Sequence, residues 1–284
     1  MNRDTAETQP PEIMKALSRR SRRLGIEGIN VLFSFDCDTP EDAAAAKDVF
    51  AQLRRRAVPA AFAVPGTMLQ LAAEQYRELS RLEAGFINHG YRPHTEHRDG
   101  RYHAITFYDQ MSPDDVTRDI REGHDAVTAV IGRRPVGFRG PHFGSFQKPE
   151  QRRVVYDAVH DLGYAFCSDT LPGSAYESGP LFEVGRSLKE LPLTGSLRDP
   201  FVILDSWNYL ADRTNYRLQE EYGTRFAETI DFFAERRLPV LLNYYADPAH
   251  VVGDAIFLRA IDHALSAGAR FRSFEEILEL TGGR

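Results

Sequence analysis

The feature that most constrains the fold is a regular alternation of short apolar runs with well-capped helical segments. The first run, residues 29–35, is almost entirely apolar and is typical of a buried strand. Strands alternating with helices of about ten or more residues predict parallel βαβ units. We therefore predict an α/β fold, a distorted (β/α) barrel of about seven parallel strands. The predicted strands are residues 29–35, 60–64, 85–88, 136–139, 164–168, 202–204 and 240–245.

Helix starts between these runs are marked by capping residues. Thr39 precedes a proline and two acidic residues, which is the composition of a helix N-terminus. Ser112 begins a second such segment, which Gly132 ends. Ser273 and Glu276 form a capping box for a last helix.

The chain changes in composition near residue 28. Residues 1–28 are polar and include four arginines between positions 19 and 23, so we expect a polar N-terminal arm, solvated or forming a short surface helix. Residues 29–284 then form a single barrel domain, because 284 residues suffice for one large core.

Charge and cysteine content narrow the partners and the compartment. The net charge of -6 argues against nucleic acid or an anionic membrane as the main partner. No apolar stretch approaches the roughly 20 residues of a membrane helix, so no integral membrane segment is predicted. Cys37 and Cys167 lie in apolar runs, and we predict buried thiols in a reducing, cytoplasmic setting. The sequence indicates no oligomeric state.

Carboxylates and histidines gather where the predicted strands end. In a parallel barrel these ends meet on one face, where active sites are built. Carboxylate and imidazole groups together are the ligand set of a catalytic zinc-type site. The residues at these ends are Asp36, Asp38, His89, His94, His97, Arg139, Asp169, Asp247 and His250.

Two of these carboxylates stand at the tip of the first strand. Asp36 and Asp38 are two residues apart, so their side chains point the same way from an extended chain. One of them can bind a metal ion while the other accepts a proton from water.

Three short motifs resemble those of the polysaccharide deacetylase family, also called the NodB-homology family. They are residues 33–38 (Phe-Ser-Phe-Asp-Cys-Asp), residues 88–91 (Asn-His-Gly-Tyr) and residues 138–141 (Phe-Arg-Gly-Pro), in the family's order and spacing. The resemblance extends over about residues 29–280 and implies the family's distorted barrel.

The resemblance also implies roles for individual residues. Asp36 would be the general base and Asp38 a metal ligand. His89 and His94 would complete the site for a divalent cation, with Zn²⁺ the expected ion. Arg139 would pair with Asp36 and lower the pKa of its carboxyl group.

The histidine spacing departs from the family pattern. Four residues separate His89 from His94, where the family has three, so a tight loop is required. His97 is an alternative ligand, because it would share a face with His94 if the segment made a helical turn.

The last motif departs as well. Asp247 stands where the family commonly has the histidine that acts as general acid, and His250 lies three residues further on. Either residue is a candidate donor to the leaving amine. Asp169 resembles the aspartate that orients the acid histidine, although a turn-capping role fits it too.

The segment after the strand predicted at 202–204 contains Trp207, Asn208 and Tyr209, which would form a wall against a sugar ring or pack in the core. The insert at 98–111 has the composition of a lid, and His142 is predicted to line the pocket or to pack. No phosphate-binding loop, GxGxxG, HExxH or GxSxG motif is present.

These observations favour a metal-dependent hydrolase that removes an acyl group, acetyl in the first instance, from an amino sugar. The expected substrate is a small molecule or a lipid- or nucleotide-linked amino sugar, as in surface-glycan biosynthesis. One alternative is hydrolysis of another non-peptide C–N bond, in a formamide or a cyclic amide. A second alternative is a non-catalytic carbohydrate-binding relative.

Overall fold

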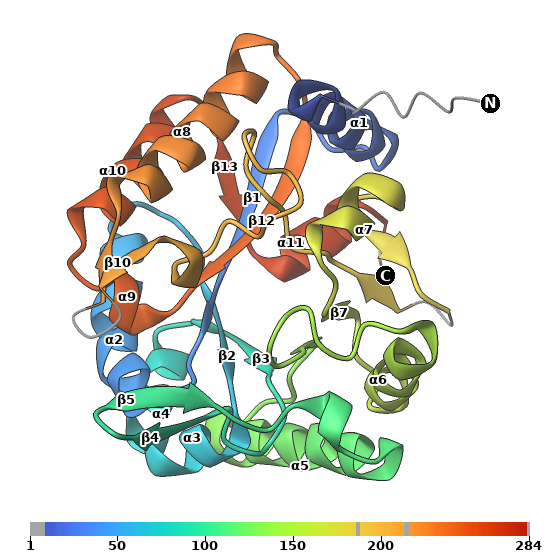
Figure 1. Cartoon of the computed structure of the whole chain (residues 1–284), viewed down its shortest axis with the longest axis vertical. Helices are drawn as coiled ribbons and strands as arrows, with labels where there is room; N and C mark the ends of the chain where they lie inside the picture. The colour runs from blue at the N-terminus through green and yellow to red at the C-terminus, as the bar shows by residue number, and fades with distance from the viewer. Residues whose placement is uncertain (1–8, 186–187, 213–215, 283–284) are drawn as a thin grey trace.

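The computed structural model describes residues 9–185, 188–212 and 216–282 of the chain. In these residues a curled, mostly parallel sheet is surrounded by helices (Figure 1). The helices are α1 (Pro10–Arg23), α2 (Pro40–Arg54), α3 (Gly66–Leu71), α4 (Ala73–Arg81), α5 (Pro113–Ile131), α6 (Pro149–Asp161), α7 (Pro172–Glu177), α8 (Glu220–Glu235), α9 (Pro248–Val251), α10 (Ala255–Ser266) and α11 (Phe274–Leu280). The strands of the main sheet are β1 (Ile29–Asp36), β2 (Ala61–Val64), β3 (Gly85–Asn88), β6 (Gly137–Arg139), β7 (Phe166–Ser168), β8 (Phe182–Glu183), β9 (Lys189–Glu190), β12 (Val240–Ala246) and β13 (Arg270–Arg272).

The sheet has the strand order β12-β1-β2-β3-β6-β7-β9-β8, and neighbours from β12 to β9 are parallel. Its far edge curls back toward β12. Past β9, the Thr194 N–H donates to the Asn243 carbonyl at 3.0 Å, and the Asn243 N–H donates to Thr194 Oγ1 at 3.0 Å. The predicted distorted barrel of about seven parallel strands is confirmed.

Strand β1 shows how the sequence places a strand between the helices outside the barrel and the side chains inside it. All eight of its residues are buried, as expected for a strand covered on both faces. Phe33 and Phe35 pack in the core between sheet and helices, whereas Leu32 belongs to the cluster inside the barrel. Because side chains alternate along a strand, Ser34 and Asp36 share the interior side with Leu32.

One prediction about an element is wrong. Residues 202–204 are not a strand, since only Ile203 forms an isolated bridge, with Gly195. Val202 is 47% exposed, so this apolar run does not lie in the core. Strand β9 instead continues the parallel sheet after β7, and its two polar residues gave no apolar signal.

Of the expected polar arm, residues 1–8 lie outside the described residues, and the segment 10–23 takes the helical alternative. It forms α1, and its residues Ile13, Met14 and Leu17 are buried in the main core. These positions recur at helical spacing, so one apolar stripe packs on the barrel while the arginines stay outside. The Ser21 hydroxyl also accepts a hydrogen bond from the backbone of Leu241 in β12, at 3.1 Å.

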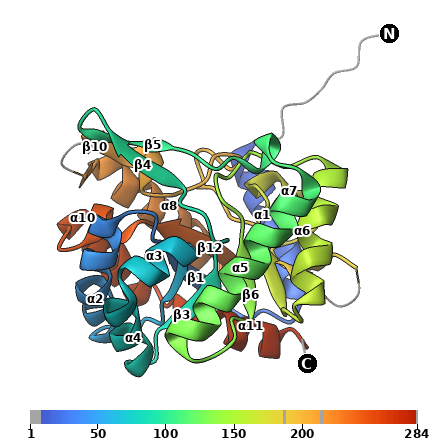
Figure 2. The same ribbon diagram turned by 90° about the horizontal axis from the view of Figure 1, so that it is seen from below.

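Strands β4 (Thr95–Arg98) and β5 (Arg101–Ala104) form a separate antiparallel hairpin. Figure 2 shows this hairpin at one end of the molecule, near β10 (Leu210–Asp212), with α11 at the other end. Strand β10 pairs with β11 (Arg217–Leu218), and short 3-10 helices occur at Tyr108–Gln110 and Trp207–Tyr209. None of the described helices combines the length and the apolarity that crossing a bilayer requires.

Candidate metal centre and catalytic cavity

Three predicted ligands converge at the tips of β1 and β3. Asp38, His89 and His94 each offer a ligand atom, and these atoms lie within 4.8 Å of one another. His89 follows β3 directly, Asp38 stands two residues past β1, and His94 stands immediately before β4. The sequence-predicted pair of imidazoles and one carboxylate therefore meets in space.

The hydrogen bonds of His89 leave one of its ring nitrogens free to bind a cation. His89 Nδ1 lies 2.7 Å from the Arg139 carbonyl oxygen, so Nδ1–H donates and Nε2 keeps its lone pair. Nε2 faces Asp38, with 3.6 Å to Oδ1. Metal-binding histidines commonly donate their other ring N–H to a backbone carbonyl, which fixes the tautomer and orients the ring.

His94 packs against this pair. Its Nδ1 lies 3.0 Å from Asp38 Oδ1, and its ring meets the His89 ring edge to face at 4.4 Å. His94 Nε2 is buried and has no hydrogen-bond partner among the described residues. A donor set of two imidazoles and one carboxylate fits Zn²⁺ or a similar first-row ion, with room for water as a further ligand.

The alternative ligand His97 is not part of this cluster. It lies exposed on β4 and packs against Tyr102. The segment is a strand and not the helical turn that the alternative required. Residues three apart on a strand point to opposite faces, so His97 cannot join His94.

Asp36 lies beside the cluster and is held by Arg139. Arg139 Nη1 is 3.2 Å from Asp36 Oδ1, and Arg139 Nη2 donates to Ser34 Oγ at 2.8 Å. The second oxygen of Asp36 lies 3.9 Å from His89 Nε2. Strands β1 and β6 thus place a buried ion pair at the inner edge of the site.

Arg139 lowers the pKa of Asp36, as predicted, but burial has the larger and opposite effect. Burial raises the pKa of Asp36 to about 7, although Arg139 acts in the opposite direction. Burial would also raise the pKa of Asp38, but His94 and then His89 outweigh it and lower the value to about 2. Burial lowers the pKa of His89 to about 3, which keeps that ring neutral.

A cavity of about 430 Å³ opens onto these groups. The hairpin β4–β5 borders it and is fastened to the barrel, because Thr95 Oγ1 donates to the Asp38 carbonyl and Tyr102 donates to Glu41. His142 lines the cavity as predicted, and its ring is hydrogen-bonded to the Ile105 carbonyl. The residues lining the cavity are Asp36, Asp38, His89, Thr95, Tyr102, Ala104, His142, Phe143, Ile203, Asp205, Trp207, Asn208, Tyr245 and Asp247.

The structure separates the two candidate acids of the last motif. Asp247, at the end of β12, lines the cavity, and its Oδ1 is buried without a hydrogen-bond partner among the described residues. Burial, together with Asp42, Asp38 and Asp36, raises its pKa well above the ordinary value. A carboxyl group that keeps its proton at neutral pH can donate it to a leaving group.

His250 lies behind Asp247 and does not line the cavity. Its Nδ1 is 2.8 Å from Ser206 Oγ, which also accepts the Asp247 N–H at 3.0 Å. The His250 ring is thus hydrogen-bonded to Ser206 through Nδ1, and its Nε2 lies 3.9 Å from Asp247 Oδ2. His250 thus contacts Asp247 from the protein side.

Asp169 does not contact His250. Within the described residues, no hydrogen bond or ion pair joins the two side chains, so the predicted orienting contact is wrong. Asp169 follows β7, and because β7 pairs with β6, its carboxylate lies against Gly140. Burial and the neighbouring Glu190 raise its pKa well above the ordinary value.

Gly140 permits this close approach and provides a stability test. A Cβ atom there would lie 1.7 Å from Asp169 Oδ1. We expect Gly140→Ala to lower the free energy of unfolding by about 1–3 kcal/mol, as overpacking in a core does. Gly173→Ala in α7 is the matched control, because a Cβ there meets open space. Urea unfolding curves compare them, and equal stabilities would contradict the close contact.

Asp205 is a cavity residue that the sequence analysis missed. Asn208 donates to both of its carboxylate oxygens, at 2.8 and 2.9 Å, and burial raises its pKa to about 7. The sequence could have identified Asp205 as a candidate, since it directly follows the run at 202–204 and precedes the residues 207–209 that were predicted to form a wall against a sugar ring. Trp207 and Asn208 do line the cavity, whereas Tyr209 is buried in the main core.

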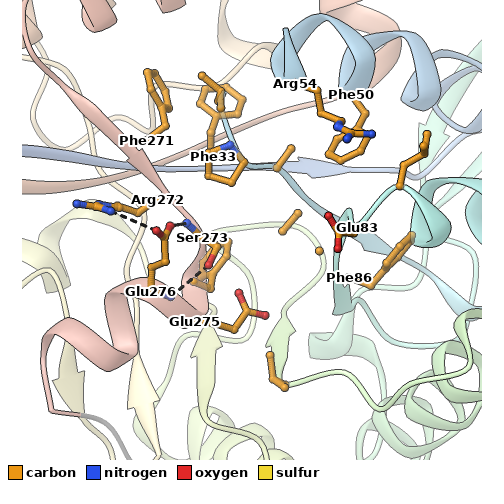
Figure 3. Close-up of a pocket in the computed structure, with 18 of the residues that line it drawn as sticks. Phe33, Phe50, Arg54, Glu83, Phe86, Phe271, Arg272, Ser273, Glu275 and Glu276 are labelled. Atoms are coloured by element: carbon orange, nitrogen blue, oxygen red, sulfur yellow. Dashed lines mark hydrogen bonds and ion pairs between the residues drawn. The ribbon is translucent and has the colours of Figure 1, made fainter. Parts of the chain in front are cut away.

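A second cavity, of about 760 Å³, lies among the segments that precede the strands (Figure 3). It includes Phe33, Phe86 and Phe271 together with Glu276, which caps α11 and pairs with Arg272. No cluster of possible metal ligands occurs there among the described residues. The N-terminal ends of barrel strands usually serve stability, so the chemistry is assigned to the smaller cavity.

Comparisons with known proteins identify a family and a shared fold. The family model described as polysaccharide deacetylase matches residues 27–166. No curated protein matches the chain.

Several solved structures share the fold at low sequence identity. A protein from Mycobacterium smegmatis assigned as a polysaccharide deacetylase is 16% identical, with a TM-score of 0.67 over 90% of this chain and 91% of that one. A protein from Pseudomonas aeruginosa PAO1 with the same assignment is 16% identical, with a TM-score of 0.66 over 89% and 91%. The Puue allantoinase is 14% identical, with a TM-score of 0.64 over 89% and 90%.

Proposed function

Through residues 27–166 the chain belongs to the polysaccharide deacetylase family, and on that premise we propose that it is a metal-dependent deacylase of a small N-acylated amine or amino sugar. The chain is a hydrolase of non-peptide C–N bonds, the reaction class of this family. The observation that supports the finer proposal most is the convergence of Asp38, His89 and His94 beside Asp36 in one cavity.

Asp38, His89 and His94 would hold the divalent ion. When bound, such an ion supplies a Lewis acid that polarises water and the acyl carbonyl. Zn²⁺ is the ion we propose, because two imidazoles and a carboxylate suit it.

The remaining steps belong to the side chains. Asp36 accepts the proton of the attacking water, and Arg139 holds the carboxylate in position through its guanidinium. Asp247 donates a proton to the departing nitrogen, which then leaves as a neutral amine. His250 is a positioning residue, since it contacts the carboxylate of Asp247 and not the cavity.

The direct test is metal-dependent release of the acyl group from N-acetylglucosamine and from small acetamides. We expect acetate from the protein supplemented with Zn²⁺ and none after chelation. Absence of acetate release, together with no stoichiometric ion, would support the non-catalytic alternative instead.

The role of Asp247 predicts a dependence on the leaving group. We expect Asp247→Asn to lower kcat about 100-fold for an N-alkylacetamide, because the alkylamine leaves only when protonated. The loss should be much smaller for 4-nitroacetanilide, whose aniline needs less help. Initial rates on both substrates measure this. Equal losses on the two substrates would exclude a general acid at this position.

A second candidate reaction is hydrolysis of a formamide or a cyclic amide by the same groups. It is supported by the small, bordered cavity and by the fold shared with the Puue allantoinase. Identification of the product distinguishes the candidates, since acetate, formate and a ring-opened acid differ in mass.

The predicted cytoplasmic location remains a prediction. Its support is that Cys37 and Cys167 are free, buried thiols, as in proteins of a reducing compartment.

A further inference from the structure

The cavity has an unbalanced charge. Four aspartates line it, and none of its described lining residues is a lysine or an arginine. Arg139 is fully buried and paired with Asp36, and a divalent ion would offset Asp38. Asp247 carries the proton that it donates as general acid, so Asp205 remains as the carboxylate without a cationic partner among the described residues.

Both carboxyl groups, of Asp205 and Asp247, are buried in the cavity wall. Asp205 is 2% exposed, and the backbone and side chain of Asn208 hold its two oxygens. Asp247 is also 2% exposed, and its Oδ1 has no hydrogen-bond partner among the described residues. An unpartnered buried carboxyl oxygen in a cavity is costly unless a ligand supplies a donor.

The aromatic lining suits the same kind of ligand. Tyr102, Phe143, Trp207 and Tyr245 contribute rings to the cavity wall. Ring faces attract cations and repel anions. The volume of about 430 Å³ accommodates one small molecule rather than a long polymer segment.

We propose that the substrate is a small N-acylated amine that carries a second, cationic amino group, and that Asp205 is the specificity-determining residue that pairs with this group. The inference rests on the proposed deacylation and names its substrate class. A phosphate or carboxylate in the same place would lose its hydration beside the fixed carboxylate of Asp205. The cavity therefore selects against the nucleotide- or lipid-phosphate-linked substrates expected from sequence.

The test uses three acetamides of matched length: N-(4-aminobutyl)acetamide, N-butylacetamide and 4-acetamidobutanoate. With the Zn²⁺-supplemented protein, we expect kcat/KM to be about 10- to 100-fold higher for the cationic probe than for the neutral one, as for a charge-assisted hydrogen bond. The anionic probe should be the poorest. A neutral or anionic probe that equals the cationic one would overturn the proposal.

Asp205→Asn tests the assigned residue. We expect it to reduce the preference for the cationic over the neutral probe to less than about threefold, through a higher KM for the cationic probe. Asp205→Ser should narrow the preference in the same way, and thermal melting confirms that both variants fold. Asp48→Asn, at an exposed position on α2, is the control and should keep the wild-type preference. An unchanged preference in both Asp205 variants would overturn the assignment.

Failure of the proposed function can be recognised separately. Zn²⁺-dependent hydrolysis of N-butylacetamide tests deacylation without involving the second amine. If no probe is hydrolysed, calorimetric titration of the same three compounds decides the substrate class. The cationic probe must then bind at least about tenfold more tightly than the anionic one, and Asp205→Asn must remove that difference. Equal binding would contradict the inference.

Discussion

Asp36→Asn is expected to lower kcat by about 10²- to 10⁴-fold while leaving the bound metal in place. The substitution keeps the size of the side chain but removes the group that accepts the proton from water. Asp36 is paired with Arg139 and lies outside the cluster of Asp38, His89 and His94, so binding of the ion should persist. Steady-state rates with an N-acetylated substrate and metal analysis of the same preparations measure both effects.

The exposed Asp48 provides the control for this substitution. Asp48→Asn should retain wild-type rate and metal content. An Asp36→Asn protein with full activity and bound metal would refute the assigned base. Loss of the metal from Asp36→Asn would instead make Asp36 a ligand.

His89→Ala is expected to weaken metal binding by at least about 100-fold and to reduce activity to the level of the metal-free protein. Its imidazole is one of only two in the described cluster, and the Arg139 carbonyl aims it at Asp38. Titration with Zn²⁺, followed by calorimetry and by activity, measures both quantities.

His97→Ala is the matched control, because it removes an exposed imidazole from the hairpin eight residues away in sequence. We expect its metal affinity and activity to equal those of the wild type. His94→Ala should resemble His89→Ala. A protein that loses its metal with His97→Ala but keeps it with His94→Ala would reverse the ligand assignment.

The sequence predicts the barrel well where local and tertiary signals agree. The strand at 85–88 and the helix cap at Thr39 are found as predicted, because a short apolar run and a capping residue each signal their structure within a few neighbouring residues. Strand β9 has only two polar residues and forms because β7 and β8 flank it, which no local pattern reveals. Helix α1 was underestimated because its apolar stripe is narrow among many charged residues.

In the site, too, some features could be predicted from local sequence and others depend on tertiary structure. The rule that polar residues at strand tips converge identified Asp36, Asp38, His89 and Asp247 correctly as neighbours. The choice between His94 and His97 depended on whether the segment was a turn or a strand.

The remaining properties of the site depend on burial, which could not be predicted from the sequence. The raised pKa of Asp36 follows from the loss of solvent around it, which outweighs the adjacent guanidinium. Asp205 also follows a run that was predicted as a strand, but only its burial in the cavity wall distinguishes it from a loop residue.

The most direct test of the metal site is anomalous diffraction from crystals of the Zn²⁺-loaded protein. We predict one strong peak bonded to a nitrogen of His89, a nitrogen of His94 and an oxygen of Asp38, each at about 2.0–2.2 Å. No peak at these side chains, or a sole peak elsewhere such as the cavity of Figure 3, would contradict the account.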